Sequence, residues 1–127
     1  MRENALSELL ARRWRDSLEP GERFLAFRGQ EGKLAVARFT LVSADGATHH
    51  EFEVAAEAGR DPERLLDLVT DACDLSVGAW LEEGRPRLAG TPETRQFEGM
   101  AVRLTETVRR PGVEAEADRL LGEPDET

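Results

Sequence analysis

Residues 33–42, KLAVARFTLV, have the strongest strand-forming character in the sequence. Alternation along this stretch puts one apolar set on a single face, namely Ala35, Ala37, Phe39 and Leu41. Asp45-Gly46 follows, and a second strand-like run occupies residues 48–55. An Asp-Gly pair between two strands is typical of a tight hairpin turn. The sequence therefore predicts an antiparallel hairpin, onto which the remaining elements pack.

The regions on both sides of this hairpin predict one more strand and two helices. An amphipathic helix is expected at residues 2–18, followed by a strand at residues 22–28. Both faces of that strand carry aromatic side chains, so we expect both faces, or its edge, to be covered. Asp61 and Pro62 are typical of a helix start. The central helix that begins there should pack against the alanine-rich face of residues 33–42.

The second half of the sequence is harder to divide into elements. Residues 76–82 alternate as a strand would, although they could also extend the central helix. Gly78 favours the strand, because glycine weakens a helix by about 1 kcal/mol. A cap signal then predicts a single helical turn at residues 90–95, followed by a last strand at residues 96–108. A short C-terminal helix is expected at residues 113–121.

Together these elements predict an α+β fold with a mostly antiparallel sheet of about five strands. The sheet would consist of a meander plus later strands, with N-terminal, central and C-terminal helices packed on it. A chain of 127 residues suits one domain, which we expect at residues 1–122, followed by an acidic, disordered tail at residues 123–127. The element order, size and acidic pI resemble the small dimeric secretion chaperones of type III systems, which implies a protein-binding function.

The composition argues against several classes of partner. The net charge is −9, and residues 113–127 alone carry −5. Such a surface repels phosphate backbones, so we expect no nucleic-acid partner. Lys33 is the single lysine among 17 basic residues, and Ile and Tyr are absent. This usage indicates a high-GC, bacterial genome, and the number of arginines is therefore no evidence for anion binding.

The sequence also lacks the signals of membrane proteins and of exported proteins. No apolar run approaches the roughly 20 residues that a membrane helix needs. The first residues, MRENALSELL, have no apolar core of the kind found in signal peptides. We therefore expect a cytoplasmic protein without a membrane partner.

No motif in the sequence is specific for catalysis, nucleotide binding or metal binding. With one cysteine, Cys73, and no Cys/His cluster, we expect neither a metal nor another cofactor. The candidate ligand-binding residues are His50, with Arg38 or Arg103 as an anion anchor; a histidine at such a position is more often a structural imidazole of the core or of an interface. The favoured hypothesis is a non-catalytic adaptor or chaperone-like module that binds another protein or forms a homodimer. The alternative is a small-ligand-binding domain or small enzyme with a pocket between sheet and central helix.

Overall fold

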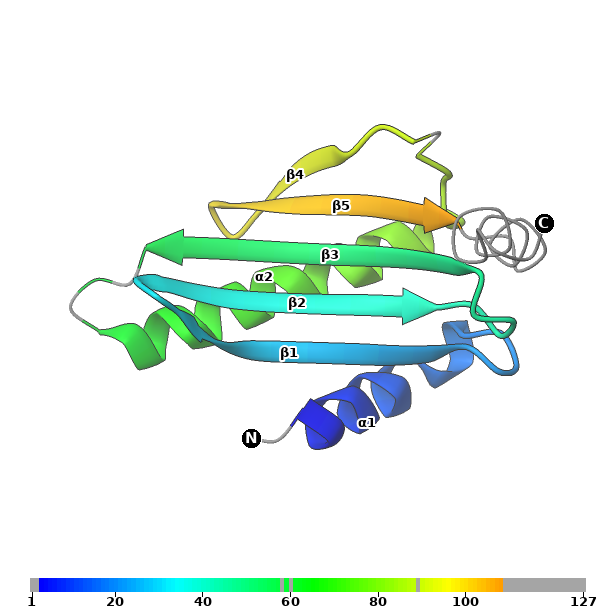
Figure 1. Cartoon of the computed structure of the whole chain (residues 1–127), viewed down its shortest axis with the longest axis horizontal. Coiled ribbons are helices and arrows are strands. Elements are labelled where there is room, and N and C mark those ends of the chain that lie inside the picture. Colours follow the sequence, from blue (N-terminus) through cyan, green and yellow to red (C-terminus); the bar gives the residue numbers. More distant parts are fainter. Residues whose placement is uncertain (1–2, 58, 60, 89, 109–127) are drawn as a thin grey trace, which may run out of the picture.

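The computed structural model describes residues 3–57, 59, 61–88 and 90–108. Its elements are α1 (Glu3–Arg13), a 3₁₀ helix (Arg15–Ser17), β1 (Arg23–Glu31), β2 (Leu34–Val42), β3 (Thr48–Glu57), α2 (Pro62–Glu82), β4 (Glu93–Phe97) and β5 (Met100–Val108). The five strands form one sheet in the order β1-β2-β3-β5-β4, and every neighbouring pair is antiparallel (Figure 1). The predicted α+β class and five-stranded antiparallel sheet are confirmed.

The prediction of three packed helices is not confirmed. Within the described residues the α-helices are α1 and α2, which correspond to the predicted N-terminal and central helices. The predicted C-terminal helix at residues 113–121 and the tail at residues 123–127 lie outside the described part of the chain. Neither of the two described helices combines the length and the apolar character that a membrane span requires.

The core lies between α2 and one face of the sheet. The face predicted from the alternation in β2 is fully buried, and α2 crosses it (Figure 1). Its alanines let the helix approach closely, so that Phe39 and Phe52 pack beneath Val77 and Trp80. Burial raises the pKa of the Cys73 thiol, and its sulfur donates to the carbonyl of Phe52 at 3.1 Å. Cys73 is therefore a packing residue of this core.

Helix α1 lies along the edge of β1 and adds Leu6 and Leu10 to the same core (Figure 1). Ser7 Oγ accepts the edge N–H of Ala26 at 3.0 Å, which satisfies a strand donor that would otherwise face solvent. The helix is shorter than predicted, because it ends at Arg13 and a 3₁₀ turn follows. The other face of β1 is open, since Leu25 there is 50% exposed. Only the edge and one face of this strand are covered.

The strand predicted at residues 76–82 is wrong, because α2 continues to Glu82. Gly78 provides the physical reason. A Cβ placed on it would lie 2.7 Å from Cη2 of Trp14, so glycine at this point lets the indole pack against the helix backbone. The indole N–H also donates to Asp74 at 3.1 Å. These tertiary contacts outweigh the low helix propensity of glycine.

The helical turn predicted at residues 90–95 is wrong, and the strand predicted at residues 96–108 is confirmed only from Met100 onward, as β5. Residues 93–108 form the hairpin of β4 and β5, which turns at Glu98-Gly99 with φ of 52° and 76°. Two consecutive positive φ angles are typical of a type I′ hairpin turn. Arg95 fixes β4 to the end of α2, since its guanidinium binds Glu83 at 2.5 Å and Glu93 at 2.6 Å.

Candidate functional sites

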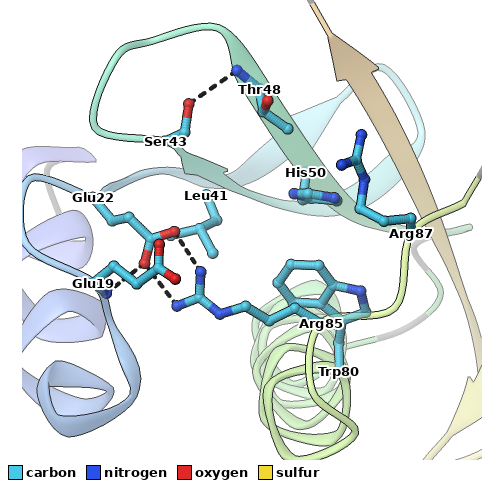
Figure 2. A pocket seen from close by; sticks show the side chains of 9 residues that line it. All are labelled: Glu19, Glu22, Leu41, Ser43, Thr48, His50, Trp80, Arg85 and Arg87. Carbon is cyan, nitrogen blue, oxygen red and sulfur yellow. Dashed lines mark hydrogen bonds and ion pairs between the residues drawn. The ribbon is translucent and has the colours of Figure 1, made fainter.

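A pocket of about 290 Å³ opens at one end of the sheet, beside the C-terminal end of α2 (Figure 2). Its side chains come from the segment before β1, the β2–β3 hairpin, the end of α2 and the loop after α2. They are Glu19, Glu22, Leu41, Ser43, Thr48, His50, Trp80, Arg85 and Arg87. The pocket therefore combines an aromatic floor with charged groups of both signs.

His50 is a buried polar residue in this pocket. It lies on the helix-covered face of β3, opposite Leu41 on β2 and Glu106 on β5. Its ring packs on the indole of Trp80 with 4.4 Å between centroids. Among the described residues its Nε2 has no hydrogen-bond partner, because the nearest carboxylate oxygen, on Glu106, is 3.8 Å away. An unpaired buried polar atom costs about 1–3 kcal/mol, so this site lacks one partner.

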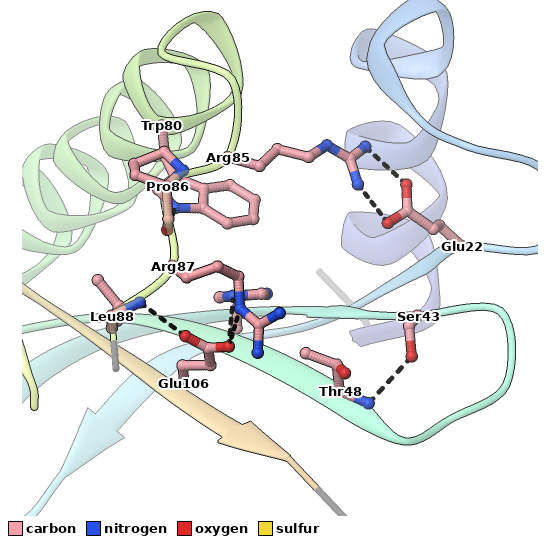
Figure 3. Close-up of polar contacts among 10 residues, drawn as sticks. Glu22, Ser43, Thr48, Trp80, Arg85, Pro86, Arg87, Leu88 and Glu106 are labelled. Carbon is pink, nitrogen blue, oxygen red and sulfur yellow. Dashed lines mark hydrogen bonds and ion pairs between the residues drawn. The ribbon is translucent and has the colours of Figure 1, made fainter. Parts of the chain in front are cut away.

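Burial sets the charge state of His50, because it lowers the pKa of the imidazole below its ordinary value. Glu106 beneath it behaves differently. Its own burial would raise its pKa, but the backbone N–H of Leu88 at 2.7 Å and the guanidinium of Arg87 outweigh this, and the pKa is lowered (Figure 3). The inner wall of the pocket is therefore a neutral imidazole above an ionised carboxylate.

The opposite wall is built on a strained residue. Arg85 has φ of 60°, a left-handed conformation that side chains other than glycine rarely adopt. Its N–H donates to Trp80 at the helix end, and its guanidinium binds both carboxylate oxygens of Glu22, at 2.5 and 2.7 Å (Figure 3). Burial of Glu22 would raise its pKa, but the contacts with Arg85 and with the N–H of Glu19 leave it lowered. This ion pair fixes the loop after α2 against the start of β1.

The structure does not bring the predicted site residues together. His50 faces α2, whereas Arg38 lies on the other face of the sheet, where it binds Glu53 at 2.7 Å. Arg103 is on that same open face, opposite Glu53 on β5. Arg38 and Arg103 therefore flank one glutamate, far from the imidazole that they were expected to accompany.

Arg85 and Arg87 line the pocket, although the sequence alone did not single them out as ligand-binding residues. They lie in the short segment Gly84-Arg85-Pro86-Arg87, which follows the helix directly. The signal in the sequence was this pair of basic residues beside a glycine and a proline. This signal indicates a binding pocket only when α2 is known to continue to Glu82, because the two arginines then lie at the end of a helix.

A second candidate surface is the outward stripe of α2. Leu68 and Leu75, two helical turns apart, are 37% and 46% exposed. A shallow groove of about 500 Å³ adjoins this stripe. Its apolar walls are Trp14, Leu75, Gly78, Ala79 and Phe97. Large apolar side chains that gather on one helix face are typical of an interaction surface.

No group of three or more potential metal ligands gathers among the residues that the structure describes. Comparisons of the chain with protein-family models, curated proteins and solved structures gave no match. The function must therefore be argued from the two surfaces themselves.

Proposed function

We propose that this chain is a non-catalytic protein-binding module of the adaptor or chaperone type, which works as a homodimer joined through the outward stripe of α2. The observation that carries this proposal is the exposure of Leu68 and Leu75 beside the groove at Gly78. A helix that buried only its inner face would place polar residues at these positions.

A second copy fits this stripe better than an unrelated surface, because the stripe is complementary to itself. Arg64, Leu68, Leu75 and Glu82 are exposed and share one face of α2, since at about 100° per residue they fall within about 40° of one another. In an antiparallel pair with its twofold axis at the level of residue 73, Leu68 of one copy lies about one helical turn from Leu75 of the other. The same arrangement places Arg64 opposite the other Glu82. The leucines of the two copies then lie between two Arg64–Glu82 contacts, which are equivalent because a twofold interface uses the same surface of both copies.

This dimer would leave the open face of the sheet available for a client protein. Leu25 and Leu34 are 50% and 40% exposed, and Phe27 lies near them under the guanidinium of Arg38. None of the described helices covers this face (Figure 1). An apolar surface of this kind suits an unfolded or extended segment of another protein.

Sedimentation equilibrium tests the dimer. We expect the wild type to be dimeric, and Arg64→Glu and Glu82→Arg each to raise the dimer Kd by about tenfold, because each reversal acts at two symmetric contacts. The double variant should recover the wild-type Kd, and Leu75→Glu should be monomeric, because it faces Asp71 of the second copy. Leu25→Glu, on the open sheet face, is the matched control and should stay dimeric. A monomeric wild type, or a double variant as weak as the single ones, would contradict this arrangement.

Light scattering during thermal unfolding of citrate synthase tests the client surface. We expect the wild-type dimer to suppress aggregation, and Leu25→Glu to lose this effect while remaining dimeric. Equal protection by both proteins would remove the open sheet face from the proposal. No protection by either would remove the chaperone part and leave the dimer standing.

A further inference from the structure

The pocket at the end of α2 is not used by the proposed dimer, and its chemistry points to a different partner. His50 Nε2 is buried in its wall without a hydrogen-bond partner among the described residues. The side chain of His50 is itself only 9% exposed. Because Nε2 is closed to solvent, a ligand would meet the ring of His50 and not this nitrogen, and the groups that line the open part of the pocket decide what it can bind.

Two charged groups on opposite sides of the pocket remain available to a ligand (Figure 2). Arg87 contacts Glu106 through Nε, and its side chain is 68% exposed. Its two terminal nitrogens make no hydrogen bond to any described residue, so they can hold a carboxylate in the usual forked geometry. Glu19 is exposed on the other side, and its carboxylate has no hydrogen-bond partner among the same residues.

The other charged groups of the pocket already have their partners. Both oxygens of Glu22 accept from Arg85, and Glu106 accepts from Nε of Arg87 and from the N–H of Leu88. A purely anionic ligand would therefore bring a second negative charge to Glu19, and a purely cationic ligand would leave the terminal donors of Arg87 without an acceptor. A molecule that carries both charges satisfies the two sides together.

The floor between these charges is apolar and rigid. Trp80 is held by a hydrogen bond from its indole N–H to the carbonyl of Pro86 at 3.0 Å, and His50 packs against it. Leu41 completes the floor. A cavity of about 290 Å³ is at the small end of ligand sites. It suits a metabolite with a single short side chain.

We infer that this pocket binds a small apolar α-amino acid, with its carboxylate on Arg87, its ammonium group at Glu19 and its side chain on Trp80 and Leu41. The hydroxyl of Thr48, at the rim, lies on the carboxylate side (Figure 2). This site is independent of the α2 stripe, which faces away from the sheet.

Isothermal titration calorimetry with the full chain tests this inference. The probes are L-leucine, L-leucinamide, which lacks the carboxylate, and 4-methylpentanoate, which lacks the ammonium group; L-alanine, L-valine and L-phenylalanine vary the side chain. We expect saturable binding of at least one amino acid. Loss of either charged group from leucine should weaken binding by about tenfold, because each removes a charge-assisted contact.

Two variants assign the charges to their partners. Arg87→Gln should bind leucine and leucinamide equally, and Glu19→Gln should bind leucine and 4-methylpentanoate equally. Both positions are exposed, so folding should be unaffected. Arg103→Gln and Glu63→Gln, away from the pocket, are the matched controls and should keep the wild-type preferences. Failure of every amino acid to bind, or preferences unchanged by the two pocket variants, would overturn the inference.

Discussion

Replacement of Gly78 by alanine should reveal the contact that determines how far α2 extends. The added Cβ would lie 2.7 Å from Cη2 of Trp14 and 3.1 Å from Cζ2, so the indole must move. Overpacking of this kind costs about 1–3 kcal/mol. Alanine in a helix is favoured over glycine by about 1 kcal/mol. The net result in the wild-type protein should be a loss of about 0–2 kcal/mol.

The sign should reverse when Trp14 is replaced by alanine, because the clash is then gone and only the helix propensity remains. Gly78→Ala should stabilise the Trp14→Ala protein by about 1 kcal/mol. Urea unfolding of the four proteins, at one protein concentration, gives the coupling free energy, which should be about 1–3 kcal/mol. If Gly78→Ala changed the free energy of unfolding equally in both backgrounds, the packing of the indole on this glycine would be refuted.

Three further predictions concern the groups around the pocket and the start of α2. The pKa of His50 is lowered in the folded state, so stability is lost as pH falls below the unfolded value of about 6.5; urea unfolding between pH 7 and 5 should show this decline, and His50→Gln should flatten it near pH 6. The pKa of Glu106 is also lowered, so its contribution should be lost only below about pH 4.5. Arg85→Ala should destabilise the protein by about 2–3 kcal/mol, because it leaves the buried Glu22 carboxylate unpaired. The double variant Arg85→Ala with Glu22→Gln should recover part of this loss, and thermal unfolding of both proteins measures the difference. Asp61→Ala should cost about 1 kcal/mol, since Asp61 accepts a helix N–H at 3.0 Å, and an unchanged midpoint of urea unfolding would refute the cap.

The part of the fold that follows from local pattern could be predicted from the sequence. The alternation in residues 33–42, the Asp-Gly turn and the start of α2 at Asp61 are each determined by neighbours in the chain. Local pattern was enough because the burial of one face of β2 and the backbone geometry of a tight turn depend on few distant contacts.

The errors have one physical cause, which is contact between residues far apart in the sequence. Gly78 weakens an isolated helix, but Trp14, more than 60 residues earlier, packs against it. Glu98-Gly99 is a weaker turn signal than Asp-Gly, so the sequence alone predicts one continuous strand across it. The turn follows from the pairing of β4 with β5. The prediction of the candidate site failed for the same reason. Alternation assigns His50, Arg38 and Arg103 each to a face of its own strand, but only the register of β2, β3 and β5 shows that His50 lies on the face opposite to the two arginines.

The two proposals rest on different sides of α2, and this makes their failures separable. Trp80 points into the core and forms the floor of the pocket, whereas Leu75, five residues earlier, points away from the sheet. A substitution on the outward stripe therefore changes the oligomeric state without touching a group that would contact an amino acid. A substitution at Arg87 or Glu19 does the reverse. If Leu75→Glu reduced both dimer formation and leucine binding, the two sites would be coupled through α2 itself, and the dimer would have to be part of the binding unit.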